Sequence, residues 1–155
     1  MKRRTLVSLL ALSATGVRAE DDSFMLITQQ QLDDEQRAQA TQRPEPPPSR
    51  KRGVFPMIRV IDPRAGDGGL PSPLRLEFHF ETSRDAHIVP ATFRVLYGIL
   101  KFDLTDTLRP HAHWNEQGVV VAQAMVPAGT HRLLVQIADD KGRVNEQELK
   151  LKVTG

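Results

Sequence analysis

The stretch Leu74-Arg75-Leu76-Glu77-Phe78-His79-Phe80-Glu81 alternates apolar and polar residues without a break. Successive side chains of a β-strand point to opposite faces, so this stretch predicts a strand with one buried and one solvent-facing side. Residues 119–126 are apolar on both faces and predict a central strand. The same period of two returns at residues 58–60, 92–97, 100–104, 132–137 and 148–153.

Turn residues separate these runs. Pro127-Ala128-Gly129 joins two of them, and Asp139-Asp140-Lys141-Gly142 predicts a hairpin whose glycine adopts a positive φ. No stretch after residue 53 keeps a helical period. Six or seven short strands in about 100 residues predict an all-β fold, a two-sheet antiparallel sandwich of about seven strands.

The order of four short patterns resembles that of bacterial Ig-like domains of exported proteins. The patterns are Pro56…Ile58-x-Val60…Pro63…Gly66, Ser72-Pro73-Leu74-x-Leu76-x-Phe78, Pro127-x-Gly129-x-His131-x-Leu133 and Asp139-x-x-Gly142-Arg143. The resemblance covers residues 54–155 and implies an Ig-like sandwich. Members of that family serve as adhesion modules, spacers or carbohydrate-linked domains, so the fold alone selects no function.

The N-terminus is typical of a cleavable signal peptide. A basic start, Met1-Lys2-Arg3-Arg4, precedes a short apolar run at residues 6–12 and small residues ending at Ala19. We therefore expect residues 1–19 to be removed and the protein to be periplasmic or secreted. The apolar run is shorter than the roughly 20 residues that cross a bilayer, so no transmembrane span is expected after cleavage. The Arg3-Arg4 pair leaves the twin-arginine export route open beside the general secretory route.

Residues 20–52 predict a disordered tether rich in Gln and Pro. Within it, Thr28 followed by Gln31 predicts the capping box of a short helix. Prolines between residues 43 and 49 favour an extended polyproline II spacer, because each lacks an N–H and fixes φ. The predicted organisation is thus a signal peptide (1–19), a tether (20–52) and a sandwich (53–155).

Charge and cysteine content exclude several functions. Residues 53–155 hold twelve acidic and twelve basic residues, so the sandwich lacks the positive potential that binds phosphate backbones, and no nucleic acid partner is expected. The chain has no cysteine, which excludes disulfides, thiolate metal sites and cysteine nucleophiles. No cofactor is expected either.

Catalytic motifs are missing from the sequence, which predicts a protein that is not an enzyme. Neither a nucleophile elbow, a phosphate-binding loop nor a His-Glu-x-x-His zinc motif occurs. Ser83, Asp85 and His87 lie close in sequence, but triads are built from distant segments. An acidic calcium site in the loops is a further alternative that lacks the usual ligand spacing.

Two hypotheses remain for function. The first is a non-enzymatic exported module that binds a protein or cell-envelope component, with Tyr97, Arg109 and Trp114 as an aromatic and basic recognition patch. The alternative is a periplasmic copper or zinc carrier that uses the imidazoles of surface histidines. Those histidines are His79, His111 and His113. Known small copper carriers are also β-sandwiches, but this chain has no methionine-rich segment.

Overall fold

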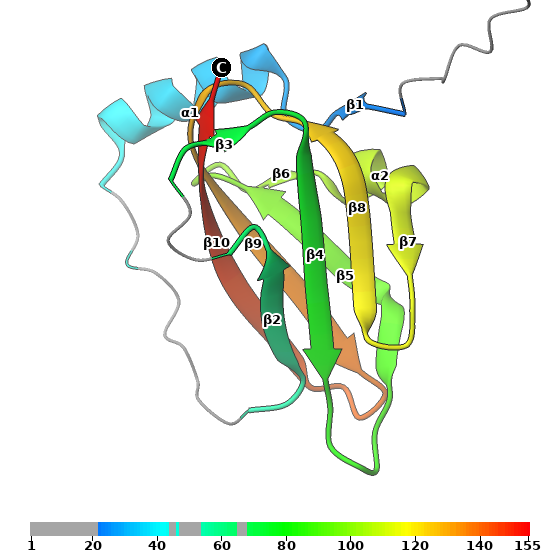
Figure 1. Cartoon of the computed structure of the whole chain (residues 1–155). Helices are drawn as coiled ribbons and strands as arrows, with labels where there is room; N and C mark the ends of the chain where they lie inside the picture. Colours follow the sequence, from blue (N-terminus) through cyan, green and yellow to red (C-terminus); the bar gives the residue numbers. More distant parts are fainter. Residues whose placement is uncertain (1–21, 44–45, 47–53, 65–67) are drawn as a thin grey trace, which may run out of the picture.

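The computed structural model describes residues 22–43, 46, 54–64 and 68–155, and they form a two-sheet sandwich (Figure 1). This confirms the all-β fold expected from the alternating sequence. The expected signal peptide lies outside the described residues, as does most of the proline-rich stretch.

The first sheet has the order β2-β4-β8, with β7 and β1 both beside the far edge of β8. All its pairs are antiparallel except β1 with β8. Its strands are β1 (Phe24–Met25), β2 (Met57–Asp62), β4 (Leu74–Glu81), β7 (Ala112–Trp114) and β8 (Gly118–Met125).

The second sheet has the order β3-β10-β9-β5-β6, and only the short β3 pairs in parallel. Its strands are β3 (Leu70–Pro71), β5 (Ile88–Tyr97), β6 (Phe102–Asp103), β9 (Gly129–Asp139) and β10 (Val144–Thr154). The strand expected over residues 100–104 shrinks to β6, because a one-turn helix α2 (Thr105–Leu108) and a 3₁₀ turn η1 (Arg109–His111) follow it directly.

This strand order is compatible with an Ig-like fold, in which one sheet holds four strands and the other is built around a three-stranded centre. The predicted hairpin between β9 and β10 is confirmed, since Gly142 has φ +73° and donates to the Asp139 carbonyl. The predicted central strand is also confirmed: β8 has partners on both edges.

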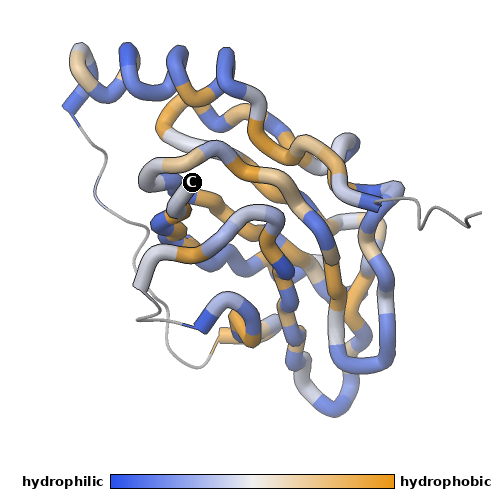
Figure 2. The backbone as a smooth tube through the Cα atoms, turned by 45° about the horizontal axis from the view of Figure 1, so that its top comes forward, coloured by the Kyte–Doolittle hydropathy of each residue, from blue (hydrophilic) through white to orange (hydrophobic). Residues whose placement is uncertain are grey.

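The core lies between the sheets and follows the period-two pattern of the sequence. Figure 2 shows hydrophobic and hydrophilic residues alternating along the strands. Leu76, Phe78 and Val119 from the first sheet meet Val95 and Ile137 from the second, and all five are fully buried. The inward rows thus account for most of the apolar surface removed from water.

Residues 22–43 belong to the folded unit, although the sequence suggested a tether there. Phe24 and Met25 pair with the end of β8, and Leu26 and Ile27 then enter the core. The expected helix is present as α1 (Gln29–Thr41), and Thr28 and Gln31 form its capping box. Figure 1 shows α1 lying across the end of the sandwich where β8 and β10 terminate.

Glu35 fastens α1 to the turn between β5 and β6. Its side chain is almost fully buried at 2% exposure and accepts hydrogen bonds from the backbone N–H groups of Ile99 (2.7 Å) and Leu100 (3.3 Å). Gly98 has φ +70°, and a Cβ there would overlap the Glu35 carboxylate. The turn therefore forms a small anion-binding nest that the chain fills with its own glutamate.

Within the described residues, no helix is long and apolar enough to cross a membrane.

Candidate functional site

Two grooves lie side by side at the open edge of the sandwich, where β5 and β7 come together. They share Pro90 and Trp114, and we call them together the Trp114 edge. The Arg109 groove has a volume of about 210 Å³ and is lined by Pro90, Ala91, Phe93, Thr105, Arg109, Ala112 and Trp114. The Glu116 groove, of about 310 Å³, is lined by Phe80, Thr82, His87, Ile88, Pro90 and residues 114–118.

Trp114 occupies the border between the two grooves because of its register on β7. It lies opposite Val119 of β8, whose side chain is buried between the sheets, so the indole also points to the inner side. Its ring packs perpendicular to Phe93 at 5.4 Å and tilted against Phe80 at 5.8 Å between centroids. Since no further strand covers this edge among the described residues, 37% of Trp114 remains exposed.

A large irregular bulge in β5 forms the facing wall of the grooves. Val89 pairs with Ala138 and Arg94 with Gln136, so residues 90–93 face a single residue of β9. The Thr92 hydroxyl bridges the gap: it accepts from the Ala138 N–H (2.9 Å) and donates to the Val89 carbonyl (2.6 Å). The bulge pushes Pro90 and Ala91 outward, where both are exposed.

Arg109 supplies the positive charge at one end of the site. It begins the 3₁₀ turn η1, and its nearest carboxylate is that of Asp106, 3.9 Å away. Both side chains are well exposed, so this pair is weak and leaves the guanidinium available. The Asp103 carboxylate fixes the start of the preceding helix α2, because it accepts hydrogen bonds from Thr105 (2.9 Å) and Arg94 (2.7 Å). These bonds, the one from Thr105 foremost, lower the pKa of Asp103 to about 2.

The outer faces of both sheets, in contrast, pair their charges internally. Because acidic and basic side chains on these faces pair with each other, little net charge is left there to attract a charged partner. On the first sheet the pairs are Arg59–Glu81 and Arg75–Glu77, and on the second they are Arg94–Asp103 and Arg132–Glu148. The exposed aromatic surface therefore lies at the edge of the sandwich.

Tyr97 is not part of the exposed patch, which corrects its assignment to a recognition surface. It is 1% exposed, because it belongs to the inward row of Phe93 and Val95. Its hydroxyl donates to Nδ1 of His131 (3.2 Å), and Nε2–H of His131 donates to the Pro127 carbonyl (2.8 Å). Burial, followed by the charge of Glu35, raises the pKa of Tyr97 to about 12.

His131 therefore fixes the loop at Pro127 from inside the core. Burial lowers its pKa, and the bond to Pro127 opposes this only in part, so the ring is neutral. Arg109 and Trp114 remain as the two proposed binding residues that the structure brings together, in one groove.

The three histidines proposed as metal ligands are kept apart by their different positions. His79 bonds Glu77 through Nε2 (3.0 Å) on the outer face of β4, and the His111 ring stacks on Phe24 with centroids 3.8 Å apart. His113 lies on β7 opposite Val120. Within the described part of the chain, no group of three or more His, Asp or Glu side chains is placed to hold a metal ion.

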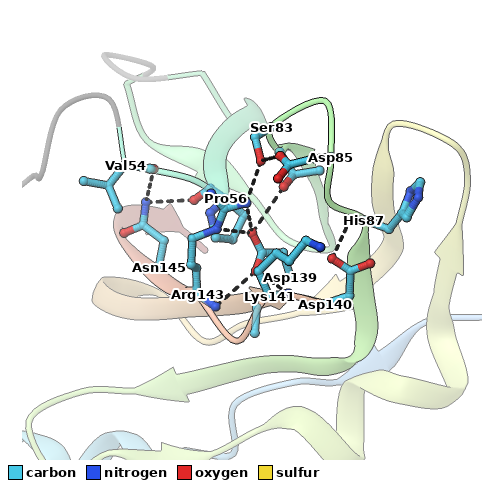
Figure 3. Close-up of polar contacts among 12 residues, drawn as sticks. Val54, Pro56, Ser83, Asp85, His87, Asp139, Asp140, Lys141, Arg143 and Asn145 are labelled. Atoms are coloured by element: carbon cyan, nitrogen blue, oxygen red, sulfur yellow. Dashed lines mark hydrogen bonds and ion pairs between the residues drawn. The ribbon is translucent and has the colours of Figure 1, made fainter.

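A polar network at the end of the sandwich opposite α1 holds the β4–β5 loop against the β9–β10 hairpin (Figures 1 and 3). Arg143 donates to Asp139 (2.7 Å from Nε) and to the Ser83 hydroxyl (2.6 Å), and Ser83 donates to Asp85 (2.7 Å). The His87 ring points away from Ser83 and Asp85, so these three residues do not form a triad. Burial raises the pKa of Asp139, but the bonds from Arg143 and Lys141 outweigh it and lower that pKa.

The two features that sequence reasoning missed are the bulge of β5 and the docked N-terminal segment. Pro90 within an otherwise alternating run was the available signal, because proline in a strand marks an edge or a bulge. For the N-terminal segment, the run Phe24 to Ile27 ahead of a capped helix was the corresponding signal. The chain matches no protein family, no curated protein and no solved structure.

Proposed function

We propose that this chain is an exported, non-enzymatic Ig-like module that binds a protein of the cell envelope through the Trp114 edge. The observation that carries the proposal is the exposed indole of Trp114 between two grooves, at an edge of the sandwich that no described strand covers. Aromatic residues and arginine, set in small apolar pockets, dominate the binding energy of protein interfaces.

The composition of the edge supports a protein ligand. Trp114, Phe93 and Pro90 supply rigid apolar surface, while Arg109 and Glu116 supply opposite charges at its two ends. This is the usual arrangement of an apolar centre with a polar rim. Export is proposed from the signal-like residues 1–19.

Affinity capture with matched variants tests this function. The chain from residue 20 onward is immobilised as wild type, Trp114→Ala and Val144→Ala, and envelope proteins retained by each are quantified. Val144 is the control because it is the more exposed side chain, at 64% against 37%, and lies outside both grooves. Loss of a Trp anchor worth about 2 kcal/mol weakens binding roughly 30-fold.

A protein retained by wild type and by Val144→Ala, but lost with Trp114→Ala, is the expected result. Equal retention by all three forms would place the binding surface elsewhere.

A further inference from the structure

The Trp114 edge is poorly suited to adding a strand from a partner. Strand addition needs a row of free backbone N–H and C=O groups on a regular edge. Pro90 has no N–H, and the bulge at residues 90–93 breaks the edge at its centre. A ligand at this edge must therefore be held by its side chains.

The size and shape of the grooves favour an extended ligand that crosses the Trp114 ring. Volumes of about 210 and 310 Å³ lie at or below the lower limit of small-molecule pockets, roughly 300 Å³. Because Trp114 and Pro90 line both grooves, one continuous chain can occupy the two in turn. Polyproline II segments bind such aromatic grooves without any backbone ladder, at little cost in conformational entropy.

The charges of the edge specify a direction for that ligand. Arg109 lies in one groove and Glu116 in the other, and Glu116 forms no ion pair within the described residues. The path from Arg109 to Glu116 is one 3₁₀ turn followed by a short extended stretch, about 15–20 Å in all. The ligand should carry an acid at one end and a base about that distance further on.

Residues 43–52 of this chain have this composition. They read Arg43-Pro44-Glu45-Pro46-Pro47-Pro48-Ser49-Arg50-Lys51-Arg52. A polyproline II conformation of a bound ligand with this sequence, at about 3.1 Å per residue, would separate the acid at position 45 from the bases at positions 50–52 by roughly 16–22 Å. We propose that the Trp114 edge binds residues 43–52 of a second copy of this chain; this inference rests on the Trp114 edge being the binding site of the proposed function.

Pro46 and Val54, the described residues within and just after the segment, lie on the side of the sandwich away from the Trp114 edge of the same copy. Pro46 lines a shallow pocket of about 40 Å³ with Arg132 and Leu134 on the second sheet, and the Val54 carbonyl accepts a bond from Asn145 of β10. Figure 1 shows β10 and β7 at opposite sides of the sandwich. Pairing between copies is thus head to tail, and it exchanges the shallow Pro46 contact for the Trp114 ring.

Intrinsic fluorescence tests the inference directly, because Trp114 is the sole tryptophan of the chain. A synthetic peptide of residues 42–52, which contains no aromatic residue, is titrated into the protein from residue 20 onward. The expected result is a saturable shift of the emission maximum. A Glu45→Lys peptide should bind wild type at least tenfold more weakly, and Arg109→Glu protein should restore its binding.

Sedimentation of the same protein completes the test. Concentration-dependent association that is lost with Trp114→Ala and kept with Val144→Ala supports the inference. A monomer at every concentration, together with an emission maximum that the peptide leaves unchanged, would overturn it. In that case Trp114-dependent capture of an envelope protein would still uphold the proposed function, whereas peptide binding without such capture would uphold only self-association.

Discussion

Replacing Glu35 with alanine removes the buried carboxylate that holds helix α1 on the sandwich. The N–H of Ile99 then loses its acceptor at a half-buried place under the helix. An unsatisfied buried donor costs about 1–3 kcal/mol, whereas Leu100 is 40% exposed and its N–H can bond water instead. We expect the variant to lose about 1–3 kcal/mol of unfolding free energy.

The matched control is Asp34→Ala, which removes a carboxylate from the same helix. Asp34 pairs on the surface with Arg37 one turn away, so its loss should cost no more than about 0.5 kcal/mol. Gly98→Ala is an independent check, because the new Cβ would displace the Glu35 carboxylate and strain a φ of +70°. It should therefore resemble Glu35→Ala.

Urea unfolding followed by circular dichroism measures the three variants, and trypsin digestion under native conditions reports on α1. Cleavage after Arg37 should become faster in Glu35→Ala and Gly98→Ala, and remain at the wild-type rate in Asp34→Ala. If Glu35→Ala and Asp34→Ala unfold at the same urea concentration, the nest does not hold the helix and the reasoning fails.

Three further predictions concern the core and the polar network. Because Tyr97 is the sole tyrosine and burial raises its pKa to about 12, absorbance of the phenolate should appear with a midpoint near 12; a midpoint near 10 would contradict its burial. The same shift implies that stability falls between about pH 10 and pH 12, by roughly 2–3 kcal/mol, since the unfolded chain releases this proton first. The lowered pKa of Asp139 contributes stability above about pH 4, and this contribution is lost as the pH falls through the pKa of the folded state. The free energy of unfolding of Asp139→Asn should therefore change less between pH 5 and pH 2 than that of wild type. Leu26→Ala should lower the free energy of unfolding in urea by about 2–5 kcal/mol, because Leu26 is a core residue. A loss below about 0.5 kcal/mol would mean that residues 22–43 are a tether and do not belong to the folded unit.

Most strands and turns of the fold could be predicted from local sequence patterns. Alternation around Leu76 and Phe78 predicted β4, and the turn ending at Gly142 predicted the last hairpin, because each depends on neighbours in sequence. Tyr97 shares the inward parity of Phe93 and Val95, which was the signal available for its burial. The interpretation of Tyr97 as a surface residue used its residue type and overlooked that parity.

Long-range contacts explain what sequence reasoning missed. Helix α1 carries few buried apolar residues, and its docking depends on Glu35 meeting backbone donors more than 60 residues away. The Trp114 edge likewise arises from the meeting of β5 and β7, which are not paired with each other and lie in different sheets. Neither arrangement leaves a periodic trace in the sequence.

Site-specific photo-crosslinking tests the central claim most directly. A photoreactive amino acid is placed at Ala91, an exposed residue that lines the Arg109 groove, or at Val144 outside both grooves. After irradiation in envelope extract or at high protein concentration, the Trp114 edge predicts a covalent adduct from position 91, absent when Trp114→Ala is added, and none from position 144. Adducts from position 144 alone, or from position 91 regardless of Trp114, would contradict the account.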